Sequence, residues 1–165
     1  MQLSPARIAI IDDDPFVMEH LAQSFRQRLS NVEVVGVSDP VAPVGYHVYI
    51  IDRDFGGNNC GQDLVQRVKK IAPNSLVIAY SAFLDRDFLR SLILEHCEGA
   101  FDKGSLRELE KMIELIEGFL EELRSTKKLS HSSRNTVRAI FELVREWNIR
   151  LSQNGHASAR YHSDV

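Results

Sequence analysis

Residues 8–14 read Ile-Ala-Ile-Ile-Asp-Asp-Asp, an apolar run that ends in three consecutive carboxylates. The apolar part predicts a short buried strand over Arg7–Asp12. Adjacent like charges repel each other and lose hydration energy when they are buried, so stability alone does not explain Asp12, Asp13 and Asp14. A hard cation such as Mg²⁺, which prefers oxygen ligands, would balance their charge. The stretch therefore predicts a strand end that carries a candidate metal site.

Apolar runs alternate with amphipathic segments along most of the chain. Further strands are predicted at Val32–Val37, Val48–Asp52, Ser75–Tyr80 and Gly99–Asp102. Helices are predicted to open at Asp14-Pro15 and to span Gly61–Ile71, Asp85–Cys97 and Ser105–Arg124. Alternation of strands and helices indicates a parallel sheet with both faces covered, and right-handed crossovers make such a sheet doubly wound. The sequence therefore predicts an α/β fold.

Polar residues follow most of the predicted strands. In a doubly wound sheet, ligands bind beyond the carboxyl ends of the strands, at the switch point of the topology. The residues expected to converge there are Asp12, Asp13, Asp52, Ser81 and Lys103. Singly, each has an ordinary explanation, as a solvated loop residue, a strand-end carboxylate, a turn hydroxyl or a surface lysine. Their ordered occurrence at successive strand ends favours one common site, while Asp14 is assigned to capping the helix that follows it.

With these motifs in place, the sequence resembles the receiver domain of bacterial two-component response regulators. The resemblance covers about residues 5–125 and rests on Ile-Ile-Asp-Asp-Asp-Pro (10–15), Ile-Ile-Asp-Arg-Asp-Phe-Gly-Gly (50–57), Ile-Ala-Tyr-Ser-Ala (78–82) and Gly-Ala-Phe-Asp-Lys-Gly (99–104). It implies a flavodoxin-like, five-stranded parallel sheet in the order 2-1-3-4-5, flanked by five helices. It also implies that a histidine kinase or phosphotransfer protein phosphorylates an aspartate of the domain, which then signals to a downstream protein.

The resemblance assigns a role to each strand-end residue. Asp52 would be the phosphoacceptor, since a carboxylate is a competent nucleophile. Lys103 would neutralise phosphoryl oxygens, and the hydroxyl of Ser81 would donate to another of them. Mg²⁺ would be held by the carboxylates of Asp12, Asp13 and Asp52 and by the backbone carbonyl of Asp54. Such a protein phosphorylates and dephosphorylates itself, and we do not expect a turnover enzyme.

Two departures from the family's pattern concern how a signal would leave the site. The stretch Ser38–Tyr46 is short and contains two prolines, so the usual second helix is expected to be truncated or replaced by a loop. Ala100 stands where the family usually has an aromatic switch residue, and the neighbouring Phe101 should point to the opposite face of the sheet. We therefore expect a signal to use another route, such as the loop after Ser81.

Two further departures replace prolines with glycines. Gly104 follows Lys103 where the family often has a cis-proline, and we expect a trans peptide bond because a cis bond before a non-proline residue costs about 2.5–4 kcal/mol. Gly56 replaces a second proline, and the run Gly56-Gly57-Asn58-Asn59 predicts a flexible loop close to Asp52. None of the four departures removes a chemical group from the site.

The predicted domains are a receiver over residues 1–124 and a helical extension with a tail over 125–165. Three apolar residues at the end of the helix Ser105–Arg124 should project and need cover, namely Phe119, Leu120 and Leu123. A second amphipathic helix is predicted at Asn135–Leu151. We favour a homodimer through these C-terminal helices, with folding back onto the same receiver as the alternative. His131 is interpreted as a linker residue rather than a phosphoacceptor.

Composition, the N-terminal residues and the cysteines limit the class of protein and its compartment. The net charge of −3 and the apolar fraction of 44% favour a globular protein that does not bind nucleic acid. The N-terminal residues lack the pattern of a signal peptide, and no apolar run is long enough to span a membrane. Cys60 and Cys97 have no metal-ligand spacing and are interpreted as free thiols in the cytoplasm, with a disulfide between them as the alternative.

Two other functions stay open on the sequence. The first is a pseudo-receiver that is never phosphorylated and acts as an interaction or dimerisation module, which the missing aromatic at position 100 favours. The second is a metal-dependent phosphohydrolase of the haloacid-dehalogenase type, because Asp52-Arg53-Asp54 superficially fits its motif. That motif belongs after the first strand, where the acidic residues of this chain lack the required spacer.

Overall fold

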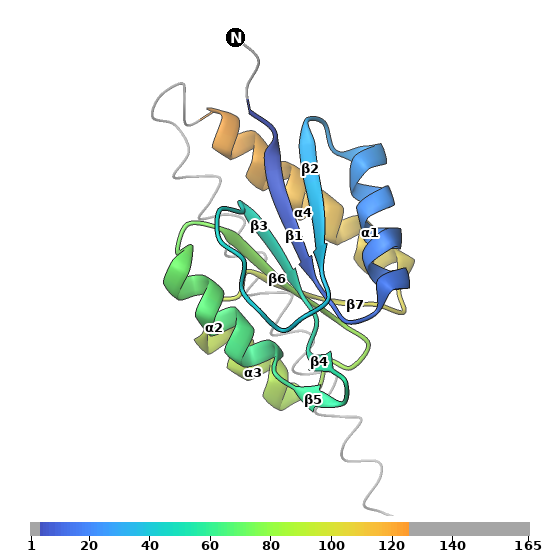
Figure 1. The fold of residues 1–165 in the computed structure, drawn as a ribbon, viewed down its shortest axis with the longest axis vertical. Coiled ribbons are helices and arrows are strands. Elements are labelled where there is room, and N and C mark those ends of the chain that lie inside the picture. Colours follow the sequence, from blue (N-terminus) through green and yellow to red (C-terminus); the bar gives the residue numbers. More distant parts are fainter. Residues whose placement is uncertain (1–3, 126–165) are drawn as a thin grey trace, which may run out of the picture.

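The computed structural model describes residues 4–125, which are built around a five-stranded parallel sheet (Figure 1). Its strands are β1 (Ala6–Ile11), β2 (Val32–Val37), β3 (Val48–Ile51), β6 (Leu76–Ser81) and β7 (Gly99–Asp102). They lie side by side in the order β2-β1-β3-β6-β7, and every neighbouring pair is parallel. Numbered among themselves, the strands have the order 2-1-3-4-5, so the predicted doubly wound fold is confirmed.

Two helices cover each face of the sheet in the described part of the chain (Figure 1). One face carries α1 (Pro15–Arg28) and α4 (Leu106–Ser125), and the other carries α2 (Gly61–Ile71) and α3 (Arg86–Leu94). Successive strand residues alternate between the two cores, which is why the apolar runs of the sequence are continuous. Helix α3 ends before the predicted Cys97 because His96 has a φ of 58°, a left-handed conformation that terminates a helix.

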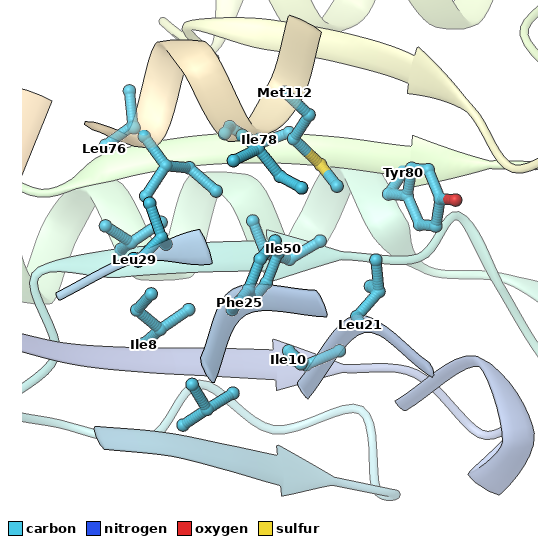
Figure 2. Packing of buried hydrophobic residues seen from close by; sticks show 14 of the residues in the cluster. Ile8, Ile10, Leu21, Phe25, Leu29, Ile50, Leu76, Ile78, Tyr80 and Met112 are labelled. Carbon is cyan, nitrogen blue, oxygen red and sulfur yellow. The ribbon is translucent and has the colours of Figure 1, made fainter. Parts of the chain in front are cut away.

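The core between the sheet, α1 and α4 fixes the relative heights of the central strands. Ile10, Ile50 and Ile78 are aligned in register and form a row across β1, β3 and β6. Phe25 of α1 is fully buried against this face, and Met112 of α4 is buried in the same core (Figure 2). Burial of such side chains contributes about 1.5–3 kcal/mol each. The packing therefore holds the carboxyl ends of the three strands next to one another.

Residues 38–47, which we call the connector, join β2 to β3 without a helix. Side-chain contacts hold the connector in place of a packed helix. The hydroxyl of Tyr49 donates to the carbonyl of Pro43 at 2.7 Å, and the guanidinium of Arg7 lies 4.4 Å from the ring centroid of Tyr46. The usual second helix is therefore absent from this part of the fold.

The end of α4 packs on its own domain, which corrects one expectation. Leu120 is 2% exposed, and Phe119 and Leu123 pack against the core shared with α1. Arg124 extends this contact, because its NH1 group donates to the hydroxyl of Ser30 at 3.3 Å. The prediction that these residues need another chain or helix to cover them is wrong, since the last turns of α4 still lie over the sheet. The predicted helix 135–151, His131 and the tail lie outside the described residues.

Two smaller expectations concern the cysteines and membrane-spanning helices. Cys60 and Cys97 are both free thiols. Within residues 4–125, no helix combines the length and the apolar character needed to cross a membrane.

Candidate functional site

Hydrogen bonds of the sheet bring four of the predicted site residues to one edge. Asp12 follows β1, Asp52 follows β3, Ser81 ends β6 and Lys103 follows β7. The amide of Asp52 donates to the carbonyl of Ile11 at 2.9 Å, and the amide of Lys103 donates to that of Ser81 at 3.2 Å. The ladders thus continue just past the strands and carry these side chains into a common region.

Three carboxylates and one ammonium group form the centre of this region. One carboxylate oxygen each of Asp12, Asp13 and Asp52 lies within 4.8 Å of the other two. The Nζ atom of Lys103 lies 2.7 Å from Oδ2 of Asp12 and 3.0 Å from Oδ2 of Asp52. Asp12 and Asp52 are buried, whereas Asp13 is exposed. One ammonium leaves a negative surplus among the three acids, and a divalent cation with a preference for oxygen ligands fits both the charge and the donor set.

Burial and charge act in opposite directions on the titrating groups. Burial raises the pKa of Asp52, and the nearby Lys103 only partly offsets this. Burial alone would lower the pKa of Lys103, but its hydrogen bond to Asp12 and the charges of Asp12 and Asp52 raise the pKa overall. Lys103 is therefore a permanent cation at neutral pH, and it is held between two carboxylates.

Backbone amides orient the three carboxylates. An oxygen of Asp12 accepts from the amide of Asp14 at 3.0 Å. An oxygen of Asp13 accepts from the amide of Gly56 at 2.7 Å, and one of Asp52 accepts from the amide of Arg53 at 2.7 Å. In Asp52 the bonded atom is Oδ1, so Oδ2 is the oxygen turned towards Lys103. The two oxygens of Asp52 are therefore in different environments. Asp14 itself caps α1 by accepting from the amide of Phe16 at 2.8 Å, which confirms its predicted role.

Ser81 and Asp54 are the predicted site residues that do not join this centre directly. The hydroxyl oxygen of Ser81 accepts from the amide of Phe83 at 3.2 Å and lies 3.5 Å from the carbonyl of the same residue. It is therefore turned towards its own loop. The carboxylate of Asp54 is not a member of the acidic group found among residues 4–125. Only the backbone carbonyl of Asp54 was expected to take part.

The segment after Asp52 is a β-hairpin rather than an irregular loop. It pairs β4 (Asp54–Phe55) with β5 (Asn58–Asn59), and Gly56 and Gly57 have φ values of 55° and 81°. Two successive positive φ values are typical of the type I′ turn that joins two strands tightly. The glycines that predicted flexibility thus also provide a defined turn, and this turn donates a hydrogen bond to Asp13.

Gly61 helps to shape the site, although its sequence context predicts only an ordinary helix start. A Cβ atom at this position would lie 2.6 Å from Cα of Arg53 and 2.7 Å from the carbonyl oxygen of Asp52. The amide of Gly61 donates to the carbonyl of Arg53 at 2.9 Å. The first turn of α2 can therefore approach the backbone around Asp52 only because Gly61 has no side chain.

We expect Gly61→Ala to lower the free energy of unfolding by about 1–3 kcal/mol, because the added methyl group forces the start of α2 away from Arg53. Denaturant unfolding followed by circular dichroism measures this effect. Gly118→Ala is the matched control, because within residues 4–125 no atom outside its own stretch of helix lies within 4 Å of a Cβ at that position. The control should gain up to about 1 kcal/mol from helix propensity. Equal stability of Gly61→Ala and the wild type would contradict the close approach.

The strand before Lys103 has the expected alternation. Ala100 is buried on the side of α2 and α3, whereas Phe101 is buried on the side of α1 and α4. The prediction that Phe101 points away from the family's switch position is confirmed. The peptide bond between Lys103 and Gly104 is trans, as expected.

Comparison with known proteins gives structural matches only. No family model matches the chain, and no curated protein matches it significantly in sequence. It is similar to the BeF₃-activated receiver domain of DrrB from Thermotoga maritima, with a TM-score of 0.61 and 17% identity over 71% of this chain and 98% of that one. It is also similar to a CheY-like receiver domain protein from Methanospirillum hungatei (TM-score 0.64, 16% identity, 74% and 99% covered). A third match is the signal receiver domain of a DNA-binding response regulator from Colwellia psychrerythraea (TM-score 0.57, 23% identity, 67% and 97% covered).

Proposed function

We propose that this chain, which has the fold of response regulator receiver domains, accepts a phosphoryl group on Asp52 in a Mg²⁺-dependent reaction. The observation that carries the proposal is the grouping of the Asp12, Asp13 and Asp52 carboxylates around the ammonium of Lys103. A structural ion pair needs one acid for each base, whereas this group holds three acids and one base. A site that handles a phosphoryl group and a cation uses all of them.

Asp52 acts as the nucleophile in this reaction. Oδ2, the oxygen turned towards Lys103, attacks phosphorus as the bond between phosphorus and the donor's leaving group breaks, and the electron pair departs with that group. The amide of Arg53 holds Oδ1 and so fixes the plane of the carboxylate. Lys103 moves from the carboxylates towards the phosphoryl oxygens, and Ser81 rotates so that its hydroxyl donates a hydrogen bond to one of them. Asp12, Asp13, Asp52 and the backbone carbonyl of Asp54 would hold Mg²⁺, which would supply neutralising charge for the phosphoryl group.

Incubation of the full chain with a small acyl phosphate tests the proposal. We expect a single phosphoryl group that is released by base, as an acyl phosphate is, and that forms with Mg²⁺ but not with excess chelator. Intact-protein mass spectrometry before and after base treatment measures it. A base-stable product, or equal labelling with and without Mg²⁺, contradicts the assignment.

The same experiment distinguishes the alternatives. Absence of labelling from small donors and from histidine kinases favours the pseudo-receiver, a reading that the lack of an aromatic at Ala100 supports. Rapid hydrolysis of unrelated phosphomonoesters favours the phosphohydrolase. The position of Asp54 argues against the phosphohydrolase, because its carboxylate stays outside the acidic group of the described residues.

The proposal includes partners. The donor is a histidine kinase or phosphotransfer protein, and the signal passes to a downstream protein. The proposal of a homodimer through the C-terminal helices rests on the apolar stripe of residues 135–151 alone, because the apolar residues of α4 are packed against their own domain. Light scattering of the full chain at several concentrations should give a dimer mass that falls on dilution. A monomer mass at every concentration contradicts the dimer.

A further inference from the structure

The side chain of Arg53 fastens the loop 82–85 to the β4–β5 hairpin. Its NH1 group donates to the carbonyl of Phe83 at 3.1 Å and to Oδ2 of Asp85 at 2.6 Å. Its guanidinium lies 4.7 Å from the ring centroid of Phe88. With the Asn59 amide turned to suit its neighbours, the amide oxygen accepts from Nε and NH2 of Arg53, both at 3.2 Å. We call this set of contacts the Arg53 latch, and it spans from the residue after Asp52 to the start of α3.

The main chain of Arg53 cannot follow movements of that loop. Its amide donates to Oδ1 of Asp52 at 2.7 Å, and its carbonyl accepts from the amides of Cys60 and Gly61 at 3.1 and 2.9 Å. The backbone is therefore fixed between Asp52 and the first turn of α2. The side chain connects this fixed point to the loop, so a displacement of the loop stretches the contacts of the guanidinium.

The loop is attached to Ser81 at its other end. The amide of Phe83 donates to the Ser81 hydroxyl oxygen at 3.2 Å. When that hydroxyl turns to donate to a phosphoryl group on Asp52, the amide of Phe83 either follows it or loses its partner. The carbonyl bound by Arg53 belongs to the same residue, Phe83, so Ser81 and the latch are joined through this one residue. Asp85, the other partner of the latch, caps α3 by accepting from the amide of Phe88 at 2.8 Å.

We propose that the Arg53 latch is the conformational switch of this domain, closed before phosphorylation and released when Ser81 engages the phosphoryl group. The inference rests on the proposed function at Asp52. It supplies the route that the missing aromatic at Ala100 leaves open, because it joins the reacting residue to the N-cap of α3. Release also frees Phe83 to change the surface at the start of that helix. Phe83 is 63% exposed, and its ring centroid lies 5.4 Å from the guanidinium.

Thermodynamic linkage predicts the direction in which latch variants change the affinity for a phosphoryl mimic. If phosphorylation opens the latch, then removing the latch favours the phosphorylated state by the same factor. We expect Arg53→Ala to bind BeF₃⁻, a phosphoryl mimic, in the presence of Mg²⁺ with half-saturation at an about 5- to 10-fold lower concentration than the wild type. Asp85→Asn should act in the same direction, because asparagine still caps the helix but lacks the charge that attracts Arg53.

Arg7→Ala is the matched control. Arg7 also stacks on an aromatic ring, that of Tyr46, and also forms an ion pair, with Glu33 at 3.5 Å, but it lies on β1 away from the carboxyl edge. Its half-saturation should equal that of the wild type. A merely structural role for Arg53 would make Arg53→Ala bind BeF₃⁻ as well as or less well than the wild type, and that result overturns the latch.

Hydrogen exchange provides a second readout. Backbone amides of residues 82–89 should exchange faster in the wild type after BeF₃⁻ binds, and they should already exchange fast in free Arg53→Ala and Asp85→Asn. Unchanged exchange on binding contradicts the switch even if the affinities differ. A wild type that binds no BeF₃⁻ with Mg²⁺ overturns the proposed function itself. Normal binding with equal affinities in all variants overturns the latch alone.

Discussion

The variant Asp52→Asn is expected to take up no phosphoryl group under conditions that label the wild type fully. An amide is a far weaker nucleophile than a carboxylate, and the substitution removes the atom that forms the new bond. Asp12 and Asp13 are unchanged in this variant, so the loss of labelling reports on Asp52 itself. Mass spectrometry after incubation with an acyl phosphate and Mg²⁺ measures the loss.

The same variant should remain folded, which separates lost chemistry from lost structure. Burial raises the pKa of Asp52, so its ionised form is less favourable in the folded than in the unfolded chain. A neutral side chain of the same shape removes this penalty, and Asp52→Asn should unfold at the same or a higher denaturant concentration at neutral pH without Mg²⁺. Asp39→Asn, an exposed acid in the connector, is the control and should label normally. Labelling of Asp52→Asn at the wild-type level would falsify the assignment of the phosphoacceptor.

The variant Lys103→Ala is expected to combine a slower reaction with lower stability. Removal of one donor to a developing charge typically slows a reaction by about 10²- to 10³-fold, and we expect a loss of that size in the rate of labelling. The substitution also leaves the carboxylates of Asp12 and Asp52 without their common counterion. Breaking such a buried pair costs about 3–5 kcal/mol, and Mg²⁺ should restore part of this stability because it supplies the missing charge.

Lys69→Ala is the matched control for Lys103→Ala. The Lys69 side chain is 14% exposed against 15% for Lys103, and it pairs with Glu98 and donates to the carbonyl of Ser75 at 3.1 Å. We expect a comparable loss of stability in denaturant unfolding, with no rescue by Mg²⁺ and unchanged labelling of the folded protein. Rescue of both variants by Mg²⁺ would show a general salt effect and contradict the specific role of Lys103.

The arrangement of the site could be predicted from the sequence because parallel strands present their carboxyl ends at one edge. Apolar runs marked the strands, and the polar residue that followed each run therefore marked the edge. The cap formed by Asp14 and the opposite faces of Ala100 and Phe101 followed from local rules of the same kind, namely helix capping and strand alternation. These features depend on a few neighbouring residues, so the sequence contains the necessary information.

The features that could not be predicted depend on residues far apart in the chain. The contacts of Arg53 with Phe83 and Asp85 join positions about thirty residues apart, and nothing in Asp52-Arg53-Asp54 indicates where the guanidinium points. The requirement for glycine at position 61 arises from the approach of α2 to the backbone of Asp52 and Arg53. The hairpin had a local signal in Gly56-Gly57, but its short flanks lack the alternating apolar pattern that usually accompanies it.

The absence of a helix between β2 and β3 gives the domain an uneven resistance to local unfolding. A packed helix must lose its internal hydrogen bonds and its apolar contacts before water reaches the sheet, whereas the connector is held by a few side-chain contacts such as that of Tyr49 with Pro43. Brief openings of the native state should therefore begin at the connector. They expose β1 and β3 first, the two strands that Asp12 and Asp52 follow, so local opening of residues 4–125 starts beside the acidic group.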